Sequence, residues 1–207
     1  MAVQTFFPFQ SGNVPMRASQ AGFRRFTVAE YHKLIQLGIL TEDDDLELLN
    51  GYLIYKMPHN PPHDRTVQRM TRPLIRYLPP GWDLRIQLAV TLPTSEPEPD
   101  FAIVRGDDSV YANHHPNPIE IGTLIEVSDS TLASDRQDKG PIYAAANVPI
   151  YWIINLVDRQ IEVYTSPSGP TANPAYTQRK DYRAADQVPL ILDGVEVARI
   201  PVQELLP

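Results

Sequence analysis

The sequence predicts an α/β (α+β) fold, with helices packed around a mixed β-sheet. Three stretches place apolar residues at the spacing of an amphipathic helix, near residues 28–37, 61–78 and 134–146. Short apolar runs bounded by turn residues lie between and after them, a pattern typical of strands. The 207 residues are 43% hydrophobic, which is enough for one complete core. Because we find no repeat and no linker, we expect one domain over residues 23–207.

The N-terminal segment differs from the rest of the chain because it has no apolar periodicity. We therefore expect an arm over residues 1–22. The first helix signal follows directly, where Thr27 and Glu30 form a T-x-x-E capping box. Gly38 fits the end of that helix, since glycine readily adopts the left-handed conformation that closes many helices.

A β-hairpin and a second helix are expected next. The hairpin covers residues 46–57 and turns at Asn50-Gly51, a dipeptide that favours the positive φ angles of a tight turn. The helix begins at Pro61, a favoured first position, and Pro73 is expected to kink or shorten it. Its buried face comprises Val67, Met70, Leu74 and Leu78.

Three strands are expected in the middle of the chain, over residues 83–92, 99–104 and 123–127. The last of these, Thr-Leu-Ile-Glu-Val, is apolar apart from Thr123 and Glu126. A nearly continuous apolar run is typical of a central strand that is covered on both faces.

A third helix is expected after these strands. Ser134 and Gln137 form a second capping box, which predicts a helix to about Ala146. Asn147 suits the left-handed position that ends it. Pro141 falls inside this helix and is expected to disturb it.

The C-terminal part adds further strands to the prediction. Buried strands are expected over residues 150–156 and 160–165, joined by a turn near Asp158. A loop over residues 167–174 follows, and residues 188–200 are expected to give one or two edge strands.

The composition limits the functions that the chain can have. The formal net charge is −7, so the protein cannot hold nucleic acid by overall charge and would need a local basic patch. There is no cysteine, which excludes disulfides and thiolate metal sites. We find no apolar run of about 20 residues that could cross a bilayer and no secretion signal, so we expect no membrane association and a cytoplasmic location.

Two carboxylates lie where a metal site could form. Asp100 begins a short strand and Glu126 lies within an apolar one. A buried carboxylate is costly unless it is paired, protonated or bound to a cation, and hard cations such as Mg²⁺ or Mn²⁺ prefer oxygen ligands. Lys139 could stabilise charge nearby. The alternative is structural, with Glu126 in a core salt bridge and Asp100 capping its strand.

Motifs of a known family occur in order along the chain. They are Glu47-Leu48-Leu49-Asn50-Gly51, His63, Pro99-Asp100, Leu124-Ile125-Glu126-Val127-Ser128, Ser130-Thr131, Asp135, Lys139, Tyr143, Val148-Pro149 and Tyr151-Trp152-Ile153-Ile154. Over about residues 24–165 the sequence resembles the Uma2 family of restriction endonucleases, a variant of the PD-(D/E)xK nuclease superfamily. The resemblance implies a restriction-endonuclease-like fold, in which helices flank a mixed central sheet.

The resemblance also implies roles for individual residues. Asp100 and Glu126 would be the metal carboxylates, and Glu47 would assist through a bound water. The usual motif has a lysine two residues after the second acid, where this chain and its family have another residue, here Ser128. We expect Lys139 on the following helix to replace that lysine.

Two departures from the family pattern are present. Ile150 and Asn155 occupy positions where the family pattern has acidic residues. Pro141 lies two residues after Lys139 and therefore affects the direction in which the lysine points. Neither departure removes one of the expected metal ligands.

A stripe of arginines gives a candidate substrate face. Four arginines follow at intervals of 4, 3 and 4, which places them on one side of the second helix: Arg65, Arg69, Arg72 and Arg76. The stripe could follow a phosphate backbone, or it could be an ordinary solvated face. His63 is expected to point inward, where it and Tyr143 would line the pocket, although Tyr143 also fits core packing. His114-His115 is read as a surface loop.

The leading hypothesis is a nuclease dependent on Mg²⁺ (or Mn²⁺) that hydrolyses phosphodiester bonds of DNA or RNA, with DNA favoured. The resemblance also implies a homodimer. The alternative is a catalytically inert binding or regulatory module with the nuclease fold, which the charge of −7 and the displaced lysine favour. A third hypothesis is a hydrolase of a small phosphorylated molecule.

Overall fold

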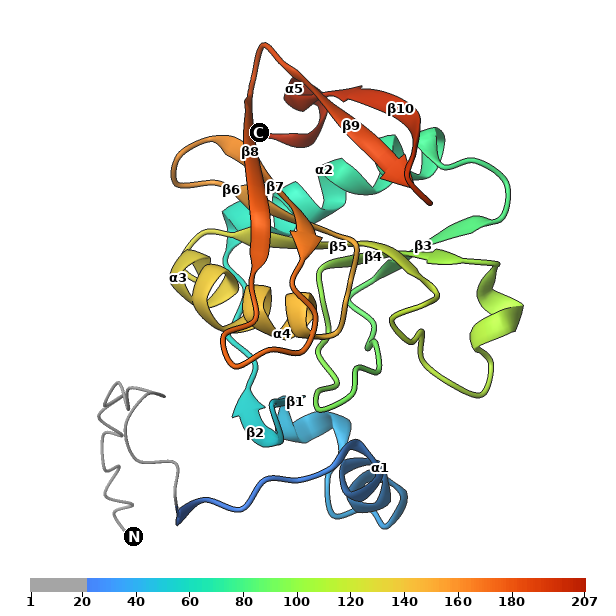
Figure 1. Cartoon of the computed structure of the whole chain (residues 1–207), viewed down its shortest axis with the longest axis vertical. Coiled ribbons are helices and arrows are strands. Elements are labelled where there is room, and N and C mark those ends of the chain that lie inside the picture. Colours follow the sequence, from blue (N-terminus) through green and yellow to red (C-terminus); the bar gives the residue numbers. More distant parts are fainter. Residues whose placement is uncertain (1–21) are drawn as a thin grey trace, which may run out of the picture.

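A six-stranded mixed sheet forms the centre of the protein (Figure 1). The structure, a computed structural model, describes residues 22–207, so the predicted arm lies outside the described residues except for Gly22. The strands lie side by side in the order β3, β4, β5, β6, β7, β8. Their bounds are Trp82–Ile86, Phe101–Arg105, Ile121–Ser128, Ile150–Asn155, Gln160–Pro167 and Tyr176–Arg183.

One parallel pair interrupts an otherwise antiparallel sheet. β5 and β6 run parallel, whereas every other neighbouring pair in this sheet is antiparallel. A parallel pair needs a crossover connection, and helical segments provide it. They are α3 (Leu132–Ser134), the π-helical turn η4 (Asp135–Lys139) and α4 (Gly140–Ala145).

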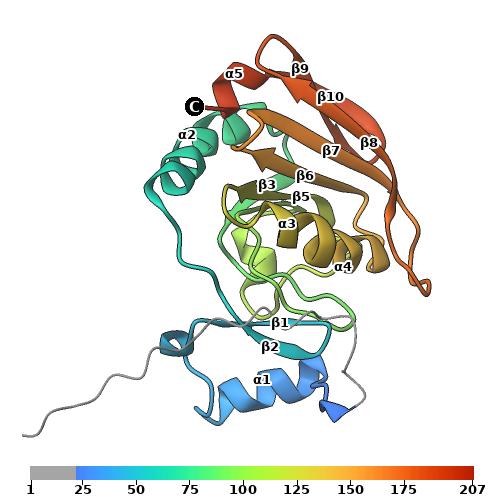
Figure 2. The ribbon, with the colours of Figure 1, turned by 90° about the vertical axis from the view of Figure 1, so that its left-hand side faces the viewer.

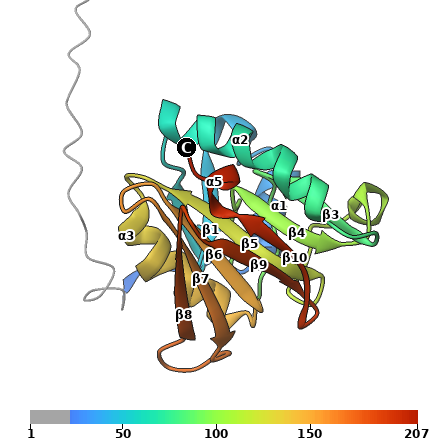
Figure 3. The same cartoon turned by 90° about the horizontal axis from the view of Figure 1, so that it is seen from above.

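Helices cover both faces of the sheet, as Figure 3 shows from above. One face packs against α2 (Pro61–Tyr77), the hairpin β9 (Gln187–Leu192) and β10 (Val195–Pro201), and α5 (Val202–Leu205). The other face packs against α4. The predicted mixed sheet flanked by helices is therefore confirmed.

The N-terminal part forms a separate layer beyond the end of the sheet (Figure 2). It contains α1 (Val28–Gln36), the short 3₁₀ turn η2 (Glu42–Asp44), and a hairpin of β1 (Leu46–Leu49) and β2 (Tyr52–Tyr55). The predicted capping box is present, since the Thr27 side chain accepts a bond from the Glu30 amide and Glu30 accepts one from the Thr27 amide.

The hairpin turns where the sequence predicts. Asn50 and Gly51 have φ angles of 49° and 81°, the left-handed conformations that this turn requires. A Cβ on Gly51 would also lie 2.7 Å from the Cβ of Arg25, so space as well as conformation demands glycine. The turn is fixed to the loop after β3, because the Gly51 amide donates to the Thr94 carbonyl at 2.9 Å.

Helix α2 begins at Pro61 as predicted, and Asn60 caps it by accepting a hydrogen bond from the His63 amide at 3.1 Å. Pro73 does not end the helix, which continues to Tyr77. No helix in the described residues is both long enough and apolar enough to span a membrane.

The strand predicted over residues 83–92 is shorter in the structure. It ends at Ile86 because Gln87 adopts a positive φ of 50°, which no extended strand can continue. The following loop turns back on itself, and the Val90 amide donates to the Pro97 carbonyl at 3.0 Å. The first residue of this loop, Gln87, lies beside Asp100 and donates to its Oδ1 atom at 3.3 Å.

The predicted capping box at Ser134 is wrong. The helix starts earlier, at Leu132, so Ser134 already has helical angles and its hydroxyl donates to Asp138 at 3.0 Å. The helix then widens into a π turn, in which the Gly140 amide donates to the Asp135 carbonyl five residues back. Pro141 follows this turn at the start of α4, where its missing amide proton costs little.

Two C-terminal elements escape the sequence patterns. β8 is an edge strand with mostly exposed polar residues, so it shows no apolar alternation. α5 is only four residues long.

The predicted strands in residues 188–200 exist as β9 and β10, which form a hairpin separate from the main sheet. A further 3₁₀ turn, η3 (Asp108–Tyr111), precedes β5.

Candidate functional site

A cavity opens at the end of the central sheet where β4 begins and β5 ends. Segments from the hairpin, from the start of α2 and from η4 meet there. The polar side chains that line it include Glu47, His63, Asp100, Glu126, Asp135 and Lys139. Five of these six were expected at the site from the sequence.

Asp100 precedes β4 and is 5% exposed. Its Oδ2 atom accepts bonds from the Val127 amide at 2.8 Å and from His63 Nε2 at 3.1 Å, and Gln87 donates to Oδ1 at 3.3 Å. Burial alone would raise the pKa of Asp100, but the bonds from His63 and Val127 outweigh it and lower the pKa. Asp100 is therefore an ionised carboxylate inside the cavity.

Glu126 lies on the neighbouring strand, opposite Asp100. The register pairs Phe101 with Ile125, so the next positions in the same ladder are Asp100 and Glu126. Because successive residues alternate between faces, both carboxylates share the sheet face that packs against α4. The side chains of such cross-strand neighbours are close enough to interact.

Two donors hold the Glu126 carboxylate. Its Oε1 atom accepts bonds from Lys139 Nζ at 2.9 Å and from the Tyr143 hydroxyl at 2.7 Å. Burial nevertheless raises the pKa of Glu126 to about 8, and the carboxylates of Asp135 and Asp100 contribute to the rise. The two donors therefore do not offset the cost of burying a charge on Glu126.

Lys139 comes from the π turn and points into the cavity, with 15% of its side chain exposed. Burial would lower the pKa of Lys139, but the carboxylates of Glu126, Glu47 and Asp135 raise it further than burial lowers it. The ammonium group therefore stays charged next to Glu126.

Glu47 reaches the cavity from β1 and is 7% exposed. Its Oε2 atom accepts a hydrogen bond from the Glu98 amide at 3.2 Å. At the mouth of the cavity, Lys56 forms an ion pair with the Glu98 side chain at 2.9 Å. The hairpin thus brings a third acid to the site from a different part of the chain.

The sequence placed both His63 and Tyr143 in the lining of the pocket, and only Tyr143 differs from that expectation. His63 does line it and binds Asp100. Tyr143 is fully buried in α4 and is not among the cavity-lining residues. Its hydroxyl donates a hydrogen bond to Glu126 from the core. Burial and the adjacent Glu126 raise the pKa of Tyr143 well above its ordinary value, so its hydroxyl remains a donor.

Asp135 is a site residue to which the sequence reasoning gave no role. It is 3% exposed and accepts bonds from the hydroxyls of Ser128 at 2.6 Å and Thr131 at 2.7 Å. Burial raises its pKa. The sequence contained a signal for it, because Asp135 lies four residues before Lys139, one helical turn away. His59 and Asp64 beside His63 were also missed.

The arginine stripe does not reach the cavity. All four side chains are exposed on α2, but Arg69 donates to the carbonyls of Gln203 and Glu204, at 2.6 and 3.2 Å. Arg76 forms an ion pair with the Glu204 carboxylate. Half of the stripe therefore anchors α5, a helix that the sequence did not predict. His114 and His115 lie in the loop after η3, as expected.

The donor set fits a hard divalent cation, since Asp100 and Glu126 offer carboxylate oxygens on one face. They do not belong to any group of three His, Cys, Asp or Glu in the described chain whose ligand atoms converge within 4.8 Å. An ion here would complete its coordination with water or phosphate oxygens, as Mg²⁺ commonly does.

A family model and a solved structure match this chain. The model of the Uma2 family, described as "Putative restriction endonuclease", matches residues 28–200. A crystal structure described as "a putative nuclease belonging to DUF820" from Anabaena variabilis matches with a TM-score of 0.61 and 14% sequence identity, over 83% of this chain and 96% of that one. At 14% identity, this structural similarity is evidence for the fold alone. A search of the curated proteins found no match.

The family match covers most of the described residues and contains the hairpin, both carboxylate strands and the π turn that carry the cavity. The structural match independently gives the same fold class. The chain therefore belongs to the Uma2 family of restriction-endonuclease-like proteins.

Proposed function

We propose that the protein is a nuclease dependent on Mg²⁺ or Mn²⁺ that hydrolyses phosphodiester bonds in nucleic acid, with DNA favoured over RNA. The observation that carries the proposal is the contact of 2.9 Å between Lys139 and Glu126, opposite the ionised Asp100. Two carboxylates and one lysine ammonium group, from three backbone segments, thus meet in one cavity.

Each side chain has a specific role in this proposal. Asp100 and Glu126 hold the cation, which when bound supplies an activated water and neutralises charge on a phosphoryl oxygen. Lys139 places its ammonium group where negative charge develops in the transition state. Glu47 assists these residues from the same cavity through a bound water molecule.

Two further residues position the acids. His63 donates to Asp100 and keeps its carboxylate in place. Tyr143 does the same for Glu126 from the core. Because a second contact fixes each acid, little reorganisation is needed when a substrate phosphate enters.

Substrate binding needs positive charge outside the acidic cavity. Arg65 and Arg72 are exposed on α2 and are the members of the stripe that we assign to phosphate contacts. Arg69 and Arg76 would contribute less, because both already bind the C-terminal segment. We also propose that the protein is a homodimer and lies in the cytoplasm.

Two observations favour a catalytically inert module instead. Burial keeps the pKa of Glu126 at about 8, and Ser128 occupies the position of the usual motif lysine. An inert protein would bind nucleic acid without turnover. A hydrolase of a small phosphorylated molecule would instead cleave a phosphate monoester and leave DNA intact.

Titration of Mg²⁺ and Mn²⁺ by calorimetry, combined with a cleavage assay on DNA and RNA, tests the proposal. We expect one or two bound ions and metal-dependent cleavage in the wild type, both lost in Asp100→Ala. The melting temperature of Asp100→Ala, measured in parallel, separates loss of the site from loss of the fold. Cleavage by Asp100→Ala at the wild-type rate would contradict the mechanism, and nucleic-acid binding without cleavage would favour the inert module.

A further inference from the structure

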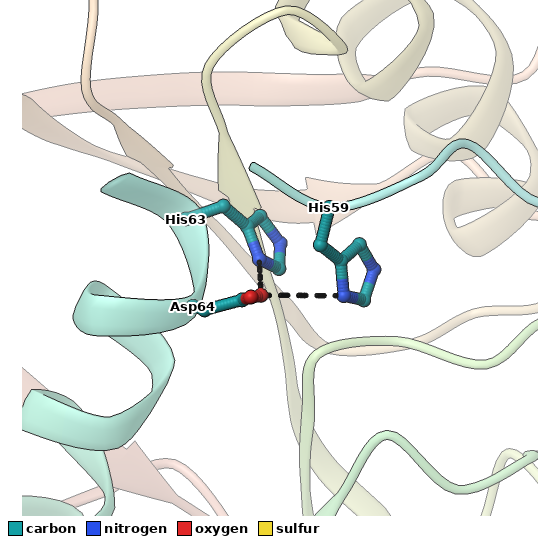
Figure 4. A group of neighbouring side chains, drawn as sticks. All are labelled: His59, His63 and Asp64. Carbon is teal, nitrogen blue, oxygen red and sulfur yellow. Dashed lines mark hydrogen bonds and ion pairs between the residues drawn. The ribbon is translucent and has the colours of Figure 1, made fainter. Parts of the chain in front are cut away.

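A cluster of nitrogen and oxygen ligands lies at the edge of the cavity, formed by His59, His63 and Asp64 (Figure 4). The Asp64 Oδ1 atom lies 3.6 Å from His59 Nδ1 and 3.4 Å from His63 Nδ1. Within residues 22–207 it is the one group of three potential metal ligands whose donor atoms all lie within 4.8 Å of one another. None of the catalytic roles proposed above uses His59 or Asp64.

The start of α2 brings these side chains together. His59 lies in the link between β2 and α2, and the Asn60 cap fixes the first helical turn. Pro61 and its neighbour Pro62 hold their φ angles near −65°, so the distance from His59 to His63 is set by a stiff segment. The cluster is thus built on a helix terminus with restricted backbone freedom.

The contact between His63 and Asp100 is one that metal-binding histidines also make. Its Nε2 atom lies 3.1 Å from Oδ2 of Asp100, which is ionised and can only accept. In the neutral ring that bond places the proton on Nε2 and leaves the Nδ1 lone pair free on the side of Asp64. Histidines that bind metals commonly donate their other ring nitrogen to a carboxylate in this way.

We propose that His59, His63 and Asp64 bind one divalent transition-metal ion, with Zn²⁺ as the best fit. Imidazole nitrogens suit Zn²⁺ and its neighbours, whereas Mg²⁺ strongly prefers oxygen ligands. Three protein ligands leave one position of a tetrahedral ion open to water. The site is distinct from the carboxylate pair and does not depend on nuclease activity.

Metal binding requires one local change. The rings of His59 and His63 are stacked, with centroids 4.2 Å apart and planes inclined by 25°. Lone pairs lie in the ring planes, so two stacked rings cannot both point at one ion. His59 has 45% of its side chain exposed, and its polar contacts are long, at 3.3 Å to Gln87 and 3.6 Å to Asp64, so its ring can rotate. His63 is held by Asp100 and stays in place.

The test is calorimetric titration of Zn²⁺ into untagged protein, with four variants. We expect one Zn²⁺ per chain in the wild type, and binding at least tenfold weaker in His59→Ala and in Asp64→Asn. His114→Ala, which removes another exposed histidine next to a carboxylate, is the matched control and should bind like the wild type. Glu126→Gln should also retain the Zn²⁺ site, because it changes only the carboxylate pair.

Co²⁺ absorption gives a second readout that does not depend on heat. A tetrahedral Co²⁺ site absorbs visible light strongly, and we expect this band in the wild type and its loss in His59→Ala. Absence of Zn²⁺ binding in the wild type would overturn the proposal. Equal binding in His59→Ala, or loss of binding in Glu126→Gln alone, would assign the ion to the carboxylate pair and would also overturn it. Neither result would contradict Mg²⁺-dependent cleavage.

Discussion

The chain contains the tripeptide Ile-Glu-Val twice, at residues 125–127 and 161–163, and its two glutamates have opposite electrostatic properties. Both side chains are buried, and both pair in register with Ile153 of β6, so they lie in one row on the same face of the sheet. The pKa of Glu126 is raised to about 8, whereas that of Glu162 is lowered to about 2.

The surrounding side chains explain the difference. Burial would also raise the pKa of Glu162, but Arg136 donates to both of its oxygens and further bonds come from Tyr164, Asn155 and Arg179. Glu126 has one lysine and one tyrosine as donors and lies near two other carboxylates. Burial alone therefore does not identify a site; a buried acid that its donors do not fully compensate is the better indicator.

The π turn connects the two glutamates. Arg136 and Lys139 lie three residues apart on η4, and the first binds Glu162 while the second binds Glu126. The Arg136 pair anchors the turn to β7, and the same turn directs Lys139 into the cavity. The structural pair and the candidate catalytic pair can be separated by mutation.

Of the two cationic residues on the π turn, Lys139 should have the larger effect on cleavage, which Lys139→Met tests because it keeps the length of the side chain but removes its charge. Cleavage should fall by about 10²–10³-fold, because one preorganised charge contact to the transition state is lost. Single-turnover rates at saturating Mg²⁺ would measure the effect. Arg136→Met is the matched control on the same turn, and its loss of rate should be much smaller at a temperature where it is folded. Equal losses in both variants would contradict a specific role of Lys139.

Glu162→Gln should instead reduce stability. Arg136 and Arg179 would lose the carboxylate that they share. We expect the free energy of unfolding to fall by about 3 kcal/mol. This is the lower end of the cost of breaking a buried ion pair, because both arginines are partly exposed. Urea denaturation would measure it. Glu196→Gln, which breaks the exposed pair with Arg199, should cost less than about 1 kcal/mol. Similar costs for the two variants would show that the Glu162 cluster is not a structural anchor.

The pH dependence of stability follows from the same residue. The pKa of Glu162 is lowered from 4.5 to about 2 in the folded protein, so its stabilisation is complete above about pH 4.5 and is lost as the pH falls through 2. A shift of this size corresponds to about 3 kcal/mol. The stability difference between wild type and Glu162→Gln should therefore narrow from pH 6 to pH 2, as urea titrations at several pH values would report. A constant difference would contradict the lowered pKa.

The smallest effect, a change in DNA affinity, is expected from the arginine stripe of α2. There the comparison is between arginines assigned to phosphate contacts and an arginine that already forms an ion pair within the protein. The double variant Arg65→Gln and Arg72→Gln should weaken DNA binding by about three- to tenfold and reduce its salt dependence, because two phosphate contacts are lost. Arg76→Gln should change binding less, since Arg76 already pairs with Glu204. Fluorescence anisotropy at several salt concentrations would distinguish them, and an equal effect of Arg76→Gln would remove the assignment.

Much of the fold could be predicted from local patterns. Capping residues, the Asn50-Gly51 turn and apolar periodicity located α1, the hairpin and α2, because each signal lies within a few residues of the element it defines. The polar edge strand β8, the short α5 and the π turn gave no such signal.

The site was predictable in part. Glu126 stood out because it is the one charged residue in an apolar strand, and Asp100 and Lys139 were singled out with it from their positions in the sequence. The family resemblance added Glu47 and the role of Lys139 as a replacement for the motif lysine. The different roles of Glu126 and Glu162 could not be read from the identical tripeptides, because their donors come from segments that only the fold brings together.

A Mg²⁺-dependent DNA cleavage assay on Glu126→Gln and Glu162→Gln, both at a temperature where each is folded, tests the central claim most directly. We expect cleavage to be abolished in Glu126→Gln, whose fold stays intact, and to persist in Glu162→Gln, whose stability falls. Cleavage that survives in Glu126→Gln, or that is lost equally in both folded variants, would contradict the assignment of Glu126 to the metal site and Glu162 to the scaffold.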